Sequence, residues 1–500
     1  MLAERVIAGK ATAMRRLFAL LLILAVAFVP AACRKQPEGT VKVIVIGGEP
    51  KLRDPSLGPL PPADAILLLN VAQGLVRFDA NGNIVGGLAE RWNVSEDGLS
   101  YIFRIASTEW PDGKKVTAQQ VARLLKRQLA DRSRNPLKDS LGAIDDVVAM
   151  TDRVIEIRLL AARPNLLSLL AQPELAILRD GEGTGPFRGA PTGGPAGEVR
   201  LTRQIVDTDE EEAKREQVLL AGEAVQQAIG EFDLGTSDLV LGGTFADLSY
   251  AQHSKLPRDA LRFDPASGLF GLVPMQADGP LADAEVRHML SQAFDRGSFI
   301  SALAVPGLSA RATLLDSGLD GPPAPDAPAW VDTPIGDRLA ALRAEADKRF
   351  GKNKPVIRVA LPQGPGTDLL FEELVRDWGA LGFTVEREAA GAPADFVLID
   401  EVAPSTAPAW YVRHFRCGVA PVCDDQADAL MAAARETPVP QQRYALLGQA
   451  AARIDDAQLF IPIAAPVRWS LVSDRVQGFA GNRYARHTLT NLEQQAGTAD

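Results

Sequence analysis

The residues best suited to nucleophilic or metal chemistry are three cysteines and four histidines. The histidines are scattered through different predicted elements: His253, His288, His414 and His487. The chain has no G-x-S-x-G, H-E-x-x-H, Walker A or G-x-G-x-x-G motif. The glycine-rich stretch at Gly181 carries a proline where a phosphate-binding loop needs a free N–H. We therefore expect no enzyme activity and no cofactor.

Two of the cysteines, Cys417 and Cys423, are separated by five residues. Such a pair can form a disulfide in an oxidising compartment, or it can supply part of a metal site. A metal site would need further ligands, and His414 is the one histidine nearby, with no cluster around it. We expect the disulfide and no metal.

The third cysteine, Cys33, follows a pattern typical of exported proteins. Two arginines come directly after Met14, and Leu17–Val29 is continuously apolar. As a helix this run reaches only about 20 Å, short of the roughly 30 Å hydrocarbon core. It is therefore predicted to be a secretory signal peptide, with Met1 or Met14 as its start and a retained short anchor as the alternative.

The residues around Cys33 resemble a bacterial lipobox, in which the cysteine is lipidated and becomes the first mature residue. Two alanines precede it, but Pro30 stands where a leucine is usual. The resemblance implies a periplasmic or other extracytoplasmic protein that a lipid anchors to a membrane.

Size and composition indicate a globular protein with more than one domain. The chain has 500 residues, of which 46% are hydrophobic and 23% charged. This length exceeds one hydrophobic core, so two or three domains are expected. The net charge of −10 argues against a nucleic-acid surface, which needs a basic stripe. After the signal peptide, no apolar run is long enough to cross a membrane.

Hydrophobic periodicity predicts mixed α/β structure. In the first half we expect strands over 40–46, 100–105 and 154–159, helices over 63–76 and 117–130, and a Gly/Pro-rich loop over 181–197. Thr117 and Gln120 are expected to form a capping box. In the second half we expect helices over 283–303 and 441–456, a Pro/Gly connection over 316–329, a β-α-β unit over 356–361, 367–381 and 383–387, and a strand over 395–399.

Several segments, taken in order, resemble family 5 extracellular solute-binding proteins, which include the oligopeptide- and dipeptide-binding proteins of ABC importers. The similar segments are 74–79 (GLVRFD), 87–99 (GLAERWNVSEDGL), 110–118 (WPDGKKVTA), 183–187 (GTGPF), 280–296 (PLADAEVRHMLSQAFDR) and 461–463 (IPI). Each alone is weak, but their order and spacing make the resemblance specific. It spans about residues 40 to 480, most of the mature chain.

The resemblance implies an α/β, two-lobe periplasmic-binding-protein-like fold (type II, large peptide-binding class) with an inserted third subdomain. It divides the chain into a signal peptide with lipobox (1–33), lobe I (34–73, 183–264 and 472–500), the inserted subdomain of lobe I (74–182) and lobe II (265–471). The ligand is expected to lie in the cleft between the lobes.

By the same resemblance, the protein is expected to bind short peptides and deliver them to ABC permease subunits. It is expected to be a monomer and not to bind nucleic acid. A non-peptide solute such as an opine, a sugar or a nickel chelate is the alternative, as is a ligand sensor without transport. Peptide binders carry a Trp-x-x-Asp element whose aspartate holds the peptide amine. This chain has no such element at Ile399–Pro404.

The candidate ligand-binding residues lie in three segments: Gly48, Glu49, Asp400, Glu401, Trp410 and Tyr411. Asp400 or Glu401 could pair with an amine, and the alternative is that both are solvated charges at a strand end. Trp410 or Tyr411 is expected to line the cleft, with a core position as the alternative. Gly48 and Glu49 sit where the family's first strand ends near the cleft.

Overall fold

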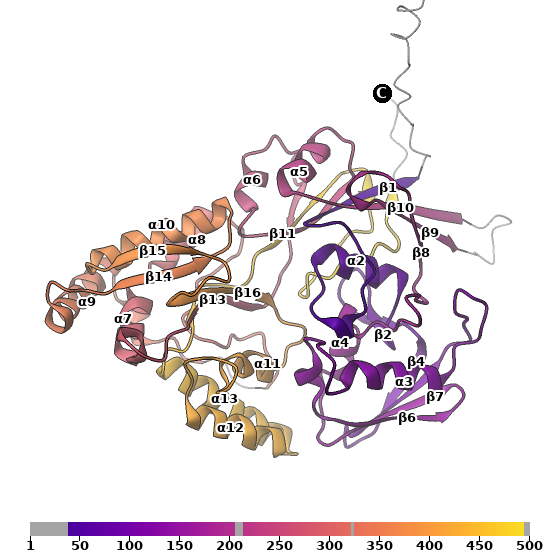
Figure 1. Cartoon of the computed structure of the whole chain (residues 1–500), viewed down its shortest axis with the longest axis horizontal. Coiled ribbons are helices and arrows are strands. Elements are labelled where there is room, and N and C mark those ends of the chain that lie inside the picture. The colour runs from indigo at the N-terminus through magenta and orange to yellow at the C-terminus, as the bar shows by residue number, and fades with distance from the viewer. Residues whose placement is uncertain (1–38, 206–213, 322–324, 495–500) are drawn as a thin grey trace, which may run out of the picture. The chain divides into compact units, whose positions relative to one another are not determined.

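The computed structural model describes residues 39–205, 214–321 and 325–494 (Figure 1). The chain divides into two compact units, Met1–Thr40 and Val41–Asp500, and the architecture below is that of the second. The predicted signal peptide and Cys33 lie outside the described residues. Among the helices that are described, none combines the length and apolar character needed to cross a bilayer.

The largest sheet of the described residues has seven strands in the order β12-β18-β11-β1-β10-β9-β8. Their bounds are β1 Thr40–Ile46, β8 Arg188–Pro191, β9 Val199–Ile205, β10 Lys214–Glu223, β11 Leu239–Thr244, β12 Leu261–Phe263 and β18 Arg468–Val472. Alternation along β1 sends Val43 and Val45 into one apolar cluster with α2 (Pro62–Val71), and Ile44 into a second cluster on the opposite face. The sheet is therefore buried on both faces along β1.

A four-stranded antiparallel sheet, β4-β5-β7-β6, follows α2 in the chain. Its strands are β4 Ala89–Val94, β5 Ser100–Ile105, β6 Ile144–Thr151 and β7 Val154–Leu159, and a small hairpin of β2 (Val76–Phe78) and β3 (Ile84–Gly86) precedes it. Helix α3 (Ala118–Leu129) packs on β6 and begins at the predicted capping box of Thr117 and Gln120. A short helix, α4 (Leu166–Leu170), comes after β7.

A five-stranded sheet has the order β15-β14-β16-β13-β17, and its strands β14 and β15 are coloured orange in Figure 1. Its strands are β13 Gly268–Pro274, β14 Val356–Leu361, β15 Thr384–Ala389, β16 Phe396–Val402 and β17 Ile461–Pro462. Helix α10 (Pro365–Ala380) joins β14 to β15, and these two strands pair in parallel. This confirms the predicted β-α-β unit.

The remaining helices flank these sheets. They are α5 Val225–Asp233, α6 Leu248–Gln252, α7 Ala284–Ala293, α8 Arg296–Leu303, α9 Ile335–Phe350, α11 Pro408–Val412, α12 Asp425–Glu436 and α13 Pro440–Asp456. Two short strands near the C-terminus, β19 (Val476–Gln477) and β20 (Glu493–Gln494), pair with each other. The predicted helix over 441–456 is confirmed as α13. In the predicted connection over 316–329, the described residues form no helix or strand until a 3-10 turn begins at Ala329.

Three predicted elements differ from the structure. The single helix expected over 283–303 is two helices, because Phe294 is extended and the Asp295 side chain caps α8 by accepting from the Ser298 N–H. The loop expected over 181–197 contains β8, an edge strand that pairs with β9. The helix expected over 63–76 ends at Val71, and Ala72 is already extended.

The predicted division into lobes stays a prediction. The four-stranded sheet falls within 74–182 and the five-stranded sheet within 265–471. Strand β18 joins the seven-stranded sheet, although Arg468–Leu471 fall in the range predicted for lobe II.

Candidate functional site

A cavity of about 460 Å³ lies between two parts of the chain that are far apart in sequence. One wall comes from residues 129–169 and the other from residues 405–447; we call them the N-side wall and the C-side wall. In Figure 1 the C-side wall carries α11, α12 and α13, and the N-side wall carries the end of α3 and α4. The volume is in the range of small-molecule sites, roughly 300–1,000 Å³.

Hydrogen bonds join the two walls around this cavity. Arg443 Nη1 donates to the carbonyl oxygen of Ala162 at 2.8 Å. Asn165 Nδ2 donates to Thr406 Oγ1 at 3.5 Å, and Arg413 donates to the hydroxyl of Ser140. Beside the cavity, Gln172 donates to the carbonyl oxygen of Pro404 at 2.9 Å. The structure is therefore a form of the protein in which the two walls touch.

Apolar side chains make up much of the cavity surface. They come from both walls: Leu129, Leu141, Ile144, Leu169, Trp410, Met431, Tyr444 and Leu447. Buried apolar surface of this kind supplies affinity for a solute, and polar groups placed within it supply orientation. The cavity is thus suited to a small molecule that carries both apolar and polar parts.

The charged side chains of the cavity are mostly basic. Six basic side chains face two carboxylates: Lys138, Arg163, Arg413, Arg416, Arg435 and Arg443 against Asp131 and Asp139. Burial, together with the charge of Arg443, lowers the pKa of Arg163 to about 10. Burial also lowers the pKa of Arg413 to about 10, against the opposing effects of Asp139 and Glu401.

Of the residues predicted from sequence, Asp400 on β16 is paired within the protein. Its carboxylate accepts from Arg468 Nη1 at 2.8 and 3.0 Å, and Arg468 Nη2 donates to the Asp400 carbonyl at 2.9 Å. Burial raises the pKa of Asp400, and the Arg468 charge opposes that rise. Asp400 does not line the cavity, and its contact with a ligand stays a prediction.

Glu401 is the more accessible of the two predicted carboxylates. Its side chain is 56% exposed, and Oε2 lies 3.4 Å from His414 Nε2. The hydrogen bond from His414 holds the pKa of Glu401 below its usual value, and Arg413 and Arg468 act in the same direction. An amine bound here would therefore compete with three basic neighbours.

The two predicted aromatic residues separate in the structure. Trp410 is 5% exposed and lines the cavity from α11. Tyr411 is fully buried in the apolar cluster beneath α11, and its hydroxyl has no hydrogen-bond partner among the described residues. Burial raises the pKa of Tyr411. The contact of either residue with a ligand stays a prediction.

Gly48 and Glu49 lie just beyond the end of β1 and are exposed. Glu49 Oε2 is 3.5 Å from Lys51 Nζ, and the Gly48 backbone lies against Gly222 of β10. Neither residue lines the cavity, and their contact with a ligand stays a prediction.

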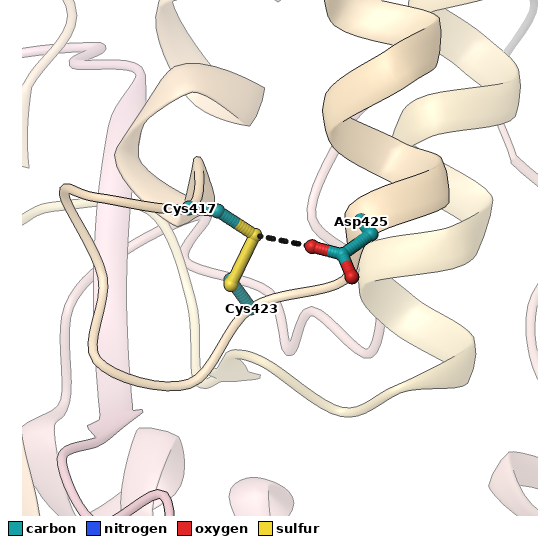
Figure 2. Close-up of side chains that lie close together, drawn as sticks. All are labelled: Cys417, Cys423 and Asp425. Atoms are coloured by element: carbon teal, nitrogen blue, oxygen red, sulfur yellow. Dashed lines mark hydrogen bonds between the residues drawn. A yellow bond between two sulfur atoms is a disulfide. The ribbon is translucent and has the colours of Figure 1, made fainter.

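The sulfurs of Cys417 and Cys423 are joined in the structure, as Figure 2 shows, with a Cα–Cα distance of 5.2 Å. Asp425 Oδ1 lies 3.5 Å from Cys417 Sγ. These three side chains are close enough to share a metal ion, but joined sulfurs offer no thiolate to coordinate one. The geometry is thus compatible with the expected disulfide.

The basic side chains of the cavity were not predicted from the sequence. Arg163 follows β7, Arg413 lies at the end of α11, and Arg443 lies in the first turn of α13. They are single arginines in three distant segments, without a shared motif. Only the fold brings them together, so no local sequence signal could have grouped them.

The profile of the bacterial extracellular solute-binding proteins, family 5 (middle segment), matches residues 83–398. The probable deoxycholate-binding periplasmic protein YgiS of Escherichia coli strain K12 is 29% identical over 129 residues, which are 22% of this chain and 24% of that protein. The probable di/tripeptide-binding protein 5 of Pseudomonas aeruginosa strain UCBPP-PA14 is 26% identical over 240 residues, 43% of each chain. The matched regions thus span less than half the length of these relatives.

Solved structures match over nearly the whole described chain. OppA of Burkholderia pseudomallei has a TM-score of 0.78 at 17% identity, covering 92% of this chain and 100% of that one. OppA of Haemophilus influenzae, solved in complex with RPPGFSPFR, has a TM-score of 0.77 at 15% identity, covering 92% and 99%. These matches confirm the two-lobe periplasmic-binding-protein fold. The matched family and these neighbours are substrate-binding proteins and not enzymes, in agreement with the expectation from sequence.

Proposed function

Because the chain belongs to family 5 of the bacterial extracellular solute-binding proteins, we propose that it binds short peptides and delivers them to the permease of an ABC importer. The observation that carries the proposal is the cavity walled by residues 129–169 and 405–447. Two names among the similar proteins support a peptide ligand: the Haemophilus influenzae OppA complex with RPPGFSPFR and the di/tripeptide-binding protein of Pseudomonas aeruginosa.

In this arrangement, solute binding depends on how close the two walls of the cavity are. A solute that contacts both walls adds interactions that exist only when the walls are close, so it shifts the population toward that form. The bond from Arg443 to the Ala162 carbonyl and the bond from Asn165 to Thr406 already span the walls. A permease that recognises the closed form would thereby sense the loaded protein. The solute itself is unchanged.

We also propose that the chain is exported and held at a membrane by a lipid on Cys33. The support is the apolar run Leu17–Val29 followed by two alanines and the cysteine. Expression in a bacterial host should place the wild-type protein in the membrane fraction, with a lipid mass on its N-terminal cysteine. The Cys33→Ser variant should lose that mass. A wild-type protein that keeps an unmodified Cys33 would contradict the tether.

The ligand is tested by melting the purified protein against a solute library after co-purified ligand has been removed by mild unfolding and refolding. A ligand at 100 times its Kd adds about 2.7 kcal/mol to the free energy of unfolding, a shift of a few degrees for a large protein. The library holds di- to pentapeptides, their N-acetylated forms, amino acids, opines, sugars and nickel chelates. Peptides that shift the melting temperature support the proposal, and a shift by other solutes alone contradicts it.

The role of the predicted carboxylates is tested with the same peptides. If Glu401 holds the peptide amine, the N-acetylated forms bind more weakly than the free ones, and Glu401→Gln removes that difference. Asp400→Asn is the matched comparison, because its carboxylate is already paired with Arg468 at 2.8 Å. Equal binding of free and acetylated peptides by the wild type would exclude an amine-holding carboxylate at either position.

A further inference from the structure

The basic side chains of the cavity are not matched by acidic ones. Of the six, Lys138 lies 3.9 Å from Asp131, and Arg416 lies 3.6 Å from Asp139. Among the described residues, no carboxylate oxygen lies within 4.0 Å of a guanidinium nitrogen of Arg163, Arg413 or Arg443. The sixth basic side chain, Arg435, is exposed to solvent. Each of the two acids of the cavity thus lies beside a basic side chain other than Arg163 and Arg443, and Asp139 also acts on Arg413 through its charge.

Arg163 and Arg443 come from opposite walls and meet at one oxygen. Arg163 Nη1 donates to the Ala162 carbonyl at 3.0 Å, and Arg443 Nη1 donates to the same carbonyl at 2.8 Å. Arg443 is 5% exposed. Two like charges held at one carbonyl repel each other, and burial strengthens that repulsion.

Buried arginines elsewhere in this chain are saturated by the protein. Arg296, 5% exposed, makes four hydrogen bonds to Pro462, Ser291 and Phe294. A guanidinium has five N–H donors. Arg163 and Arg443 each use one of them on the Ala162 carbonyl, and the remaining donors have no protein acceptor among the described residues. The buried Arg443 therefore differs from the equally buried Arg296 in keeping donors available to a solute, and the partly buried Arg163 keeps donors as well.

We propose that the cavity takes a small solute with two or more anionic groups, carboxylate or phosphate, one of them bound by Arg163 and Arg443 together and another by Arg413 on the C-side wall. This assignment rests on the proposed function and specifies its ligand class. Arginine forks bind both kinds of anion with paired N–H donors, which favours these groups over a neutral solute. An anion shared by Arg163 and Arg443 also replaces their repulsion by attraction to both walls.

The test is calorimetric titration of the purified, ligand-free protein with charge-matched probes. The dipeptides Glu-Glu, Gln-Gln and Lys-Lys differ mainly in side-chain charge, whereas citrate and 3-phosphoglycerate carry two or more anionic groups without a peptide bond. We expect Glu-Glu, citrate or 3-phosphoglycerate to bind at least about tenfold more tightly than Gln-Gln and Lys-Lys. The affinity should weaken as salt is raised from 50 to 300 mM.

The outcomes separate this inference from the peptide proposal. Binding of citrate or 3-phosphoglycerate without any dipeptide supports the anionic class, and it overturns the peptide proposal when the longer peptides of the melting library also cause no shift. Gln-Gln or Lys-Lys binding as tightly as Glu-Glu overturns the anionic class and leaves the peptide proposal standing. If none of the three anionic probes binds, the anionic class is overturned.

Variants place the effect in the cavity. Arg163→Gln and Arg413→Gln should each lower affinity for the anionic probe by at least about tenfold, and Arg163→Lys should lower it less, since it keeps the charge. Arg123→Gln removes an exposed arginine of α3 outside the cavity and should leave affinity unchanged. Unchanged affinity in both Arg163→Gln and Arg413→Gln overturns the assignment. The probe series on the wild type decides the question even if a variant fails to fold.

Discussion

Arg163 and Arg443 both donate a hydrogen bond to the carbonyl oxygen of Ala162, at 3.0 and 2.8 Å, although they come from opposite walls of the cavity. Such a pair stabilises contact between the walls only weakly while it is alone, because the guanidinium charges repel. An anion bound by both guanidinium groups attracts both walls and stabilises their contact. Ligand binding and closure are thereby linked through two residues.

Replacing Arg163 should have opposite effects on stability and binding. Burial and the charge of Arg443 lower the pKa of Arg163, so its charged form is disfavoured in the folded protein. Arg163→Gln should therefore increase the free energy of unfolding of the ligand-free protein by about 1 kcal/mol, and its melting temperature should rise accordingly. Denaturant unfolding at low salt measures this. A ligand-free variant clearly less stable than the wild type would contradict the repulsion.

The pair of Asp400 and Arg468 joins the five-stranded and seven-stranded sheets, since Asp400 lies in β16 and Arg468 in β18. Each side chain is 16% exposed. Burial raises the pKa of Asp400 in spite of Arg468, so the neutral side chain of Asp400→Asn should leave the free energy of unfolding within about 1 kcal/mol of the wild type at pH 7. Arg468→Gln leaves the buried Asp400 carboxylate without a counter-charge, so we expect a loss of about 2–4 kcal/mol, part of which the double variant Asp400→Asn, Arg468→Gln should recover. Equal stability of wild type and Arg468→Gln would show that Arg468 does not offset the burial of Asp400.

The ionisation of Asp455 in α13 should make the free energy of unfolding depend on pH. Burial raises its pKa to about 7, against the opposing hydrogen bond from the Leu314 N–H at 2.9 Å. The folded pKa exceeds the unfolded value, so its stabilising effect is full below about pH 4 and is lost as the pH rises through 7. Asp455→Asn keeps an acceptor for Leu314 and cannot ionise.

The variant should therefore match the wild type at pH 4 and be more stable at pH 8, by about 2 kcal/mol. Denaturant unfolding of both proteins at pH 4, 6 and 8 measures the difference. A difference that stays constant with pH would show that Asp455 does not titrate in this range.

The Cys417–Cys423 bond closes a short loop, with a sequence separation of 6. Closing a loop of this length restricts the unfolded chain by about 2 kcal/mol. Cys417→Ala with Cys423→Ala should lower the free energy of unfolding by that amount, and a reducing agent should do the same to the wild type. Thiol labelling of the unfolded, non-reduced protein provides the control: two reactive thiols there would mean that the bond does not form.

Most of the fold could be predicted from local sequence. Strand β7 has the predicted bounds, and the capping box of Thr117 and Gln120 is present as expected. Both follow from signals contained in a few consecutive residues. The break at Asp295 was missed because the apolar period continues across it, although an aspartate in that position can end one helix and cap the next.

The candidate site could be predicted only in part. Trp410 lines the cavity and the adjacent Tyr411 does not, although both belong to the same buried apolar cluster. The sequence could not separate these neighbours, since a five-residue helix gives little periodicity. The grouping of Arg163 with Arg443 could not be predicted, because it depends on the distance between segments that are 281 residues apart in the sequence at the Arg443–Ala162 contact.

The most direct test is to fill the cavity. Gly142 lines it with helical φ and ψ of −63° and −4°, and a Cβ there meets only the Asp139 carbonyl, at 3.5 Å. Gly142→Trp should therefore fold and place an indole in the space for the solute. Gly336→Trp, on exposed α9 where a Cβ meets nothing within 4 Å, is the control. The measurement is the shift in melting temperature caused by the tightest solute found for the wild type. We predict a shift of a few degrees in the wild type and in Gly336→Trp, and none in Gly142→Trp. An equal shift in a folded Gly142→Trp would contradict solute binding in this cavity.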